Sequence, residues 1–230
     1  MKVSIIIPCF NEEKTISLII DKIYMQEKII KEVIIINDGS TDNTSKILME
    51  LKEKYRDIIL INHENNKGKG SALKTGFSNA TGDLILIQDA DLEYDPSDYS
   101  KLIVPFIKTD AQIVYGSRFM GGDYVRLHYY WHYIANKLLT TMTNIFTNLN
   151  MTDMETGYKV FKKECLKDIS LAEKGFGIEP EITVKLAKKK FIFYEVPISY
   201  SGRSYEEGKK ITIKDAFRAL FCIVRYSIFK

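Results

Sequence analysis

The apolar residues of the chain gather in short, continuous runs dominated by β-branched side chains. Continuous runs, rather than runs that alternate with polar residues, are typical of strands covered on both faces. Five of them fall in the first half of the sequence, at Val3–Ile7, Val33–Ile36, Ile58–Ile61, Leu84–Ile87 and Ile113–Tyr115. We therefore expect a sheet with a strand at each of these positions.

Segments with helical periodicity separate these runs. Residues 12–26 place isoleucines on one face of a helix, and residues 44–55 repeat this pattern. Shorter helices are expected over residues 71–79 and 97–108. The alternation of strands and helices predicts an α/β fold, with a mostly parallel central sheet and helices on both faces. In such sheets ligands bind beyond the carboxyl ends of the strands.

The pattern changes after residue 120. It predicts an aromatic-rich helix over residues 127–149, a strand over 158–161, a helix over 179–190 and a strand over 191–200. An amphipathic helix follows over residues 212–229. Because no repeat or linker-like stretch interrupts the sequence, we expect residues 1–230 to form a single domain whose second half builds on the first.

Composition and charge narrow the functional class. The chain has 230 residues, and 33 Lys and Arg nearly balance 30 Asp and Glu, a net charge of +3 that argues against nucleic-acid binding. Three widely spaced cysteines indicate a reduced, cytoplasmic protein. No signal peptide is recognisable, and no apolar stretch reaches the ~18 residues of a spanning helix. We expect a protein that is soluble, or at most peripheral to a membrane.

Polar residues follow the first two strands. Pro8, Asn11 and Glu12 come after the first, and Asn37 and Asp38 after the second. Neither segment contains the glycine-rich pattern of a dinucleotide-binding or phosphate-binding loop. The carboxylates indicate acceptors for the N–H groups of a base or for sugar hydroxyls. The alternative interpretation is that they only cap the following helices.

The strongest chemical pattern follows the fourth strand, where Asp89, Asp91 and Glu93 are spaced two residues apart. Residues with this spacing share one side of an extended chain, so the three carboxylates are expected to converge. Unpaired carboxylates repel one another and call for a cation, and a set of oxygen ligands favours Mg²⁺ or Mn²⁺. An acidic turn that caps a helix before Pro96 is the alternative.

Basic residues lie after later strands. Arg118 follows the fifth strand, and Arg203 and Lys209 belong to a glycine-bounded loop near the end of the chain. Arginine binds phosphate in a bidentate manner, and lysine adds a compact charge. Together with a metal ion they predict a diphosphate site, unless Arg203 and Lys209 only decorate a solvated loop.

These segments together resemble a known family. The sequences SIIIPCFNEE, INDGSTDNT and QDADLE, with the later DMETGYK, FGIEPE and YSGR, are similar to those of inverting glycosyltransferases of family 2, within a branch without membrane spans related to dolichyl-phosphate mannose and glucose synthases. The resemblance implies the Rossmann-like GT-A fold. It also implies a nucleotide-sugar-binding half over residues 1–120 and an acceptor-side half over residues 121–230.

The resemblance further implies a role for each site residue. Pro8, Asn11, Glu12 and Asp38 would line the base and ribose of the nucleotide. Asp89 and Asp91 would hold the metal and diphosphate, with Glu93 as a further polar ligand. Arg118, Arg203 and Lys209 would lie near the phosphates of donor or acceptor.

The expected reaction is transfer of a sugar from a UDP- or GDP-sugar to a polyprenyl phosphate, with Mg²⁺ or Mn²⁺. An anionic phosphate oxygen needs no general base, whereas a hydroxyl of a glycan acceptor does, and Asp153 and Glu155 are then the candidates. Both of them alternatively cap a turn. A sugar-nucleotide pyrophosphorylase and a non-catalytic nucleotide-sugar-binding module are the other functions considered.

The terminal amphipathic helix carries cations beside an apolar stripe, which suits peripheral contact with an anionic membrane. Packing of that stripe on the rest of the domain is the alternative.

Overall fold

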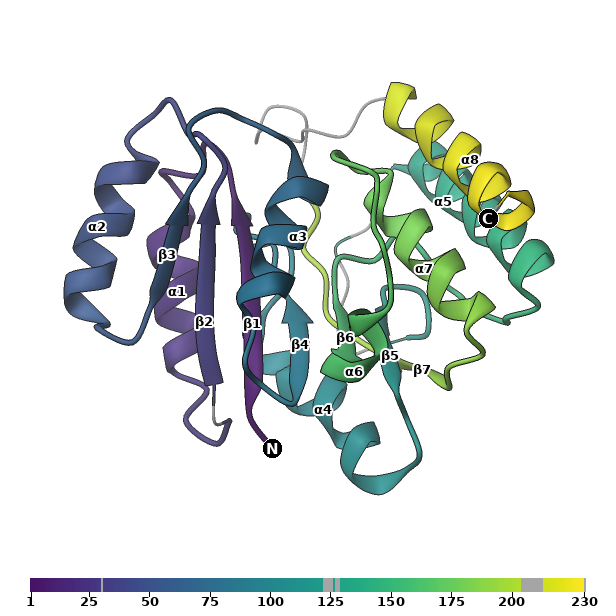
Figure 1. Cartoon of the computed structure of the whole chain (residues 1–230), viewed down its shortest axis with the longest axis horizontal. Helices are drawn as coiled ribbons and strands as arrows, with labels where there is room; N and C mark the ends of the chain where they lie inside the picture. Colours follow the sequence, from purple (N-terminus) through teal and green to yellow (C-terminus); the bar gives the residue numbers. More distant parts are fainter. Residues whose placement is uncertain (30, 122–125, 127–128, 204–212, 230) are drawn as a thin grey trace.

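A seven-stranded sheet forms the centre of the computed structural model, which describes the whole chain except residues 30, 122–125, 127–128, 204–212 and 230. The strand order is β3-β2-β1-β4-β6-β5-β7 (Figure 1). The strands are β1 (Val3–Cys9), β2 (Lys31–Asn37), β3 (Ile59–Asn62), β4 (Leu84–Ile87), β5 (Ile113–Ser117), β6 (Lys159–Lys162) and β7 (Phe193–Pro197).

Six of these strands run in one direction and β6 runs in the other. β1, β2, β3 and β4 pair in parallel, β6 pairs antiparallel with both β4 and β5, and β7 is parallel to β5. The prediction of a mostly parallel sheet is therefore confirmed. The position of β6 between β4 and β5 was not predicted, because the pattern of a strand does not reveal its partners.

Helices cover both faces of the sheet, as predicted. One face packs against α1 (Ile16–Tyr24), α2 (Thr44–Lys54) and α4 (Tyr99–Lys108). The other packs against α3 (Lys69–Asn79), α5 (Tyr130–Thr147), α6 (Lys163–Lys167), α7 (Ile178–Lys188) and α8 (Ile213–Ile228). In β1, Ile5 and Ile7 contribute to the first core and Ile6 to the second, which explains why the strand is apolar throughout.

The helix boundaries differ from the predictions in two places that matter for the site. The first helix begins at Ile16 rather than at residue 12, so Glu12 lies in the turn after β1. The third begins at Lys69, two residues earlier than expected. Gly68 and Gly70, on either side of Lys69, fit closely against the backbone of Glu173 and Lys174. A short 3₁₀ turn, Pro96–Asp98, precedes α4.

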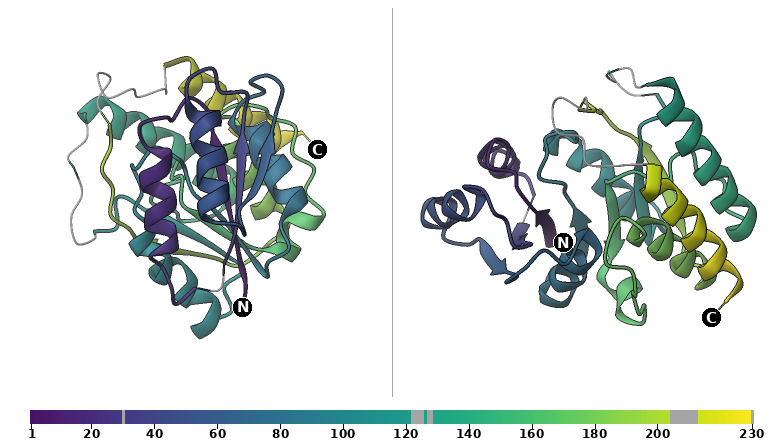
Figure 2. Two further views of the ribbon diagram at one scale, coloured as in Figure 1. Left: turned by 90° about the vertical axis from the view of Figure 1, so that its left-hand side faces the viewer. Right: turned by 90° about the horizontal axis from the view of Figure 1, so that it is seen from above.

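The second half of the chain adds a layer of helices beside the sheet. α5, α7 and α8 pack together on the side of β5 and β7, and α5 and α8 form the outer surface there (Figures 1 and 2). The chain thus places residues from β1 and from α8, far apart in sequence, around one end of the sheet.

Candidate functional site

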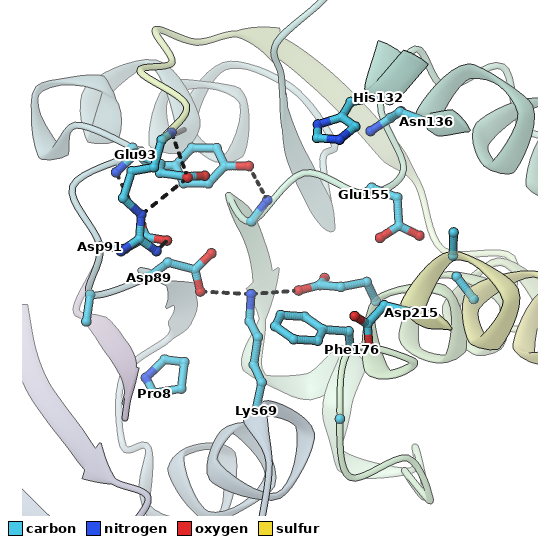
Figure 3. A pocket seen from close by; sticks show the side chains of 18 of the residues that line it. Pro8, Lys69, Asp89, Asp91, Glu93, His132, Asn136, Glu155, Phe176 and Asp215 are labelled. Atoms are coloured by element: carbon cyan, nitrogen blue, oxygen red, sulfur yellow. Dashed lines mark hydrogen bonds and ion pairs between the residues drawn. The ribbon is translucent and has the colours of Figure 1, made fainter. Parts of the chain in front are cut away.

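A pocket of about 670 Å³ opens at the carboxyl ends of β1, β2, β4 and β5 (Figure 3). Nine of the residues predicted for the site line it, from both halves of the chain. These are Pro8, Glu12, Asp38, Asp89, Asp91, Glu93, Arg118, Glu155 and Arg203. Predicted residues that are up to 195 positions apart in sequence are therefore brought together, as expected for an edge at which parallel strands end.

The acidic residues after β4 lie in a turn and not in an extended strand. β4 ends at Ile87, and Leu92 has a positive φ of 63°. This left-handed conformation is unfavourable for a branched residue, and such strain is found most often at functional sites. The backbone N–H of Glu93 donates to Asp91 Oδ1 at 3.2 Å. Asp91 and Glu93 share the guanidinium of Arg203, whereas Asp89 pairs with Lys69. The extended geometry expected for the three carboxylates is therefore absent, and their joint role as metal ligands stays a prediction.

Arg203 lies among three carboxylates at this turn. Its guanidinium contacts Asp91 Oδ2 at 2.8 Å, Glu93 Oε1 at 3.4 Å and Glu12 Oε2 at 3.5 Å. Its backbone N–H also donates to Glu93. Burial, followed by repulsion from Asp89 and Glu93, nevertheless raises the pKa of Asp91 to about 7. Negative charge therefore remains in excess beside Asp91.

Asp89 has a different cationic partner, Lys69. Lys69 Nζ lies 2.8 Å from Asp89 Oδ1 and 3.0 Å from Glu179 Oε1 (Figure 3). Burial opposes the charged form of Lys69, but the two carboxylates outweigh it and raise its pKa above the ordinary value. Since α3 begins at Lys69, the first turn of this helix delivers the lysine between the two acids.

The charges continue beneath the pocket. Glu179, in the first turn of α7, also contacts Nζ of Lys159 at 2.5 Å. Lys159 is completely buried on β6 and donates to the carbonyl of Thr156 as well. Asp89, Lys69, Glu179 and Lys159 thus form a row of alternating charges from the acidic turn to β6.

Lys69, Glu179 and Lys159 were not predicted as site residues. The run Gly68-Lys69-Gly70 does not match the pattern of a phosphate-binding loop, so no role was predicted for it from the sequence. The sequence did contain one indication of a role for Lys69. This residue lies between two glycines at the start of a helix, where its side chain can reach the edge of the sheet. Nothing in the sequence indicated that its partners follow 20 and 110 residues later.

Arg118 and Asp153 form a close pair at the wall of the pocket. The guanidinium donates to Asp153 through Nε at 2.6 Å and Nη2 at 2.7 Å, and the backbone N–H of Arg118 donates at 3.1 Å. Asp153 is completely buried and does not line the pocket, whereas Arg118 does. The carboxylate of Asp153 orients the arginine by this geometry.

Glu155, the other candidate base, faces the pocket below His132 and Asn136 (Figure 3). Its Oε1 atom is buried and makes no hydrogen bond to any described residue. Burial, with repulsion from Glu179, raises the pKa of this carboxyl to about 7, against opposing contributions from Lys159 and Arg118. A carboxyl with this pKa is suited to exchange protons near neutral pH.

Asn11 and Asp38 make contacts that order the loops after β1 and β2. Asn11, at a φ of 51°, accepts a hydrogen bond from Thr41 N–H at 2.8 Å and does not line the pocket. Asp38 contacts His63 Nδ1 at 2.6 Å and accepts from Gly68 N–H at 2.7 Å, which holds the chain leading into α3. Of the remaining predicted residues, Lys209 lies outside the described part of the chain.

The sequence matches the family model described as glycosyl transferase family 2 over residues 4–170. One relative, 30% identical over 94% of this chain and 92% of its own length, is the UDP-N-acetylglucosamine–dolichyl-phosphate N-acetylglucosaminyltransferase of Methanococcus voltae. Another, the dolichol-phosphate mannosyltransferase of Pyrococcus furiosus, is 30% identical over 91% of this chain and 59% of its own. A dolichyl-phosphate beta-glucosyltransferase of Trichomonas vaginalis is 27% identical over 99% and 73%.

Solved structures with a similar fold include glucosyl-3-phosphoglycerate synthase of Mycobacterium tuberculosis in complex with Mn²⁺, UDP and phosphoglyceric acid. Its TM-score is 0.75 at 18% identity, over all of this chain and 79% of the other. This likeness confirms the GT-A fold that the sequence predicted. The matched family and the relatives confirm the resemblance noted in the motifs and leave the pyrophosphorylase alternative without support. Since the family model spans most of the sheet and the acidic turn after β4, the chain is a glycosyltransferase and belongs to glycosyl transferase family 2.

Proposed function

We propose that this enzyme transfers a sugar from a UDP- or GDP-sugar to a polyprenyl phosphate, with inversion at the anomeric carbon and with a divalent metal ion. The observation that carries the proposal is one pocket in which an acidic turn, Lys69, Arg118 and Arg203 face a common space. This combination suits a metal-bound diphosphate beside a second phosphate. The three relatives support the acceptor, because their names specify dolichyl or dolichol phosphate.

The residues at the acidic turn fit a Mg²⁺ or Mn²⁺ ion. Asp89 and Asp91 supply carboxylate oxygens, the ligands that these cations prefer, and each side chain keeps 18% of its surface exposed beside the pocket. Burial raises the pKa of Asp91, and repulsion from Asp89 and Glu93 raises it further; a cation would relieve this repulsion. The backbone N–H of Glu93 donates to Asp91, so Glu93 lies beside this proposed ligand. When bound, the metal would supply positive charge for the diphosphate leaving group.

No group of three or more metal-ligating side chains is assembled among the described residues. An ion that takes part of its ligands from substrate phosphates and water does not require such a group. The Mn²⁺ and UDP in the M. tuberculosis synthase, and the Mg²⁺ and UDP in a second structure of that enzyme, support this interpretation.

The cationic side chains of the pocket have a part in the proposed reaction. As the bond to the anomeric carbon breaks, negative charge grows on the departing diphosphate. Lys69, Arg118 and Arg203 are already oriented by carboxylates, so they stabilise this charge without reorganisation. A phosphate acceptor attacks through an oxygen that is already anionic. The transfer to a lipid phosphate therefore proceeds without a general base.

The surface beside the pocket suits a lipid-linked acceptor. α5 exposes Trp131, Leu138 and Ile145, and α8 exposes Phe217 and Phe221. Trp131, Asp215 and Ala216 from the same two helices line the pocket, which therefore opens next to this apolar surface. Within the described residues, no helix is long and apolar enough to cross a bilayer. Peripheral contact through α5 and α8 is accordingly part of the proposal.

The acceptor is tested by measuring transfer of labelled sugar from UDP- and GDP-sugars in the presence of Mn²⁺ or EDTA. Polyprenyl phosphate, the corresponding polyprenol and a soluble glycan serve as acceptors. We expect a metal-dependent product with the polyprenyl phosphate alone. Transfer to the polyprenol or the glycan at a similar rate would contradict the phosphate as acceptor.

A hydroxyl acceptor is a second candidate. It is favoured by Glu155, whose Oε1 atom is buried and makes no hydrogen bond to any described residue. Such an acceptor must lose a proton, and Glu155 has a pKa near 7 that suits a general base. The substitution Glu155→Gln separates the two cases. Transfer to a phosphate acceptor should persist in this variant, whereas transfer to a hydroxyl should fall by about two orders of magnitude or more.

A further inference from the structure

The segment of residues 172–177, between α6 and α7, supports the first turn of α3. The N–H of Ser71 donates to the carbonyl of Lys174 at 3.1 Å. A Cβ atom at Gly68 would lie 2.5 Å from the carbonyl oxygen of Lys174, and one at Gly70 would lie 2.6 Å from that of Glu173. The two backbones are thus in direct contact on both sides of Lys69.

The same segment also forms part of the pocket. Gly175 and Phe176 line it, and Phe176 lies beside Lys69 and Asp215 in Figure 3. Any displacement of the segment therefore acts twice on the pocket. It moves Phe176 directly, and it moves Lys69 through the start of α3.

Glu173 ties this segment to α8 although it does not itself line the pocket. It is 5% exposed and accepts three hydrogen bonds from the guanidinium of Arg218, at 2.8 to 3.0 Å, and one from Tyr226 O–H at 2.9 Å. Burial tends to raise the pKa of Glu173, but these bonds hold it below the ordinary value. Glu181 of α7 binds the backbone of the same segment at the N–H groups of residues 172 and 173.

We propose that Glu173 is a positioning residue. Through Arg218 and Tyr226 it fixes α8 to residues 172–177, and this segment in turn sets the places of Lys69 and Phe176 in the pocket. The inference goes beyond the proposed function, because it concerns the coupling of α8 to the pocket and holds for any donor or acceptor. Coupling of this kind is reciprocal, so occupation of the pocket should also hold α8 in place.

Cys222 provides a reporter for the attachment of α8. Its side chain is completely buried, and a Cβ atom at Gly177 would lie 2.9 Å from its Sγ. Burial, with the charge of Glu173 and a hydrogen bond to it, raises the pKa of the thiol to about 12, whereas Arg218 lowers it. Removal of Arg218 would by itself slow alkylation, so faster alkylation in a variant without this arginine reports local opening of the helix. Cys9 and Cys165 are buried elsewhere and serve as internal references.

The test compares Glu173→Gln and Arg218→Met with Arg225→Met, which removes the same charge from α8 without touching Glu173. Iodoacetamide labelling is followed by peptide mass spectrometry, and hydrogen exchange is measured for peptides of the first turn of α3. For Arg218→Met we expect alkylation of Cys222 about tenfold faster, as for loss of a hydrogen bond to a charged group. In Glu173→Gln the thiol pKa also falls because Glu173 no longer raises it, so hydrogen exchange is the readout for that variant. Exchange at Ser71 should accelerate in both variants, and Arg218→Lys should restore part of the protection.

Nucleotide binding supplies a readout that a purely structural role would not change. By calorimetry with Mn²⁺ and the nucleotide that the wild type binds, UDP or GDP, we expect affinity to fall several-fold in Glu173→Gln and to remain unchanged in Arg225→Met. Nucleotide should slow alkylation of Cys222 in the wild type.

Unchanged or slower alkylation of Cys222 in Arg218→Met would overturn the role of the Glu173–Arg218 pair in holding α8. Faster alkylation with unchanged exchange at the start of α3 would overturn the coupling to the pocket. Labelling and exchange need no nucleotide, so they decide the inference even if the wild type binds neither UDP nor GDP, a result that would contradict only the proposed donor.

Discussion

Glu155 has a buried carboxyl oxygen, and burial raises the pKa of this carboxyl from its ordinary 4.5 to about 7. The folded state therefore binds its proton more tightly than the unfolded state, and stability is lost as pH rises from about 4.5 through 7. We predict that Glu155→Gln increases the free energy of unfolding at pH 8, by up to about 3 kcal/mol, and has a much smaller effect at pH 5. Urea unfolding at both pH values measures this.

Glu32, at the opposite end of the sheet, is the matched control. Despite burial, hydrogen bonds from Ser4, Thr81 and Lys2 lower the pKa of its carboxyl to about 2. Its stabilising contribution is present above about pH 4.5 and disappears as pH falls through 2, so Glu32→Gln should destabilise the protein at pH 8. The same change at both pH values for Glu155→Gln would refute the pKa assigned to that residue.

Asp91 is the residue whose replacement we expect to slow sugar transfer the most. Replacement by Ala removes one proposed metal ligand and frees Arg203 from its shortest contact, at 2.8 Å. We predict a loss of sugar transfer of about two orders of magnitude or more, comparable to removal of one electrostatic group at a transition state. The unfolding midpoint should change little, because repulsion at the acidic turn also decreases. Full activity of Asp91→Ala in EDTA would exclude the metal site.

The start of α3 is where the fit between elements can be tested. A Cβ atom at Gly70 meets backbone 2.6 Å away, whereas one at Gly175 meets nothing within 4 Å. We predict that Gly70→Ala lowers the free energy of unfolding by about 1–3 kcal/mol, the usual cost of overpacking. Gly175→Ala should remain within about 0.5 kcal/mol of the wild type. Equal effects in denaturant unfolding would contradict the close contact.

Much of the element plan was predictable from the sequence. Continuous β-branched runs identified β1, β2 and β4 because these strands are buried on both faces. The helix α6 was not predicted because five residues are too few to show a repeating helical pattern of apolar positions. Asp89 and Asp91 were found since they directly follow a strand. Lys69 and Glu179 were not, because their pairing depends on how α3 and α7 pack, which is a tertiary property.

At the scale of the whole molecule, the outer surface of α5 and α8 leads to a prediction about membranes. Phe217 and Phe221 are exposed on α8, near Lys214, Arg218 and Arg225. We predict that the protein sediments with anionic vesicles at low salt and is released by high salt, as expected for an interfacial helix flanked by cations. The double substitution of Phe217 and Phe221 by Ser should abolish sedimentation without loss of stability.

Met49→Ser is the control for that experiment, because Met49 is similarly exposed but lies on α2, at the far side of the sheet. It should leave vesicle binding unchanged. Wild-type protein that stays in the supernatant at low salt would mean that α5 and α8 do not meet the bilayer, and a soluble acceptor would then be favoured.

The antiparallel strand β6 has a consequence for folding during synthesis of the chain. β4 pairs with β1 on one side and with β6 on the other. Until Lys159–Lys162 has been synthesised, the apolar strand Leu84–Ile87 is the open edge of a partial sheet made of β3, β2, β1 and β4. Open apolar edges recruit other chains. Pairing of β6 with β4 covers this edge, although pocket residues such as Phe176, Arg203 and Ala216 come later in the sequence.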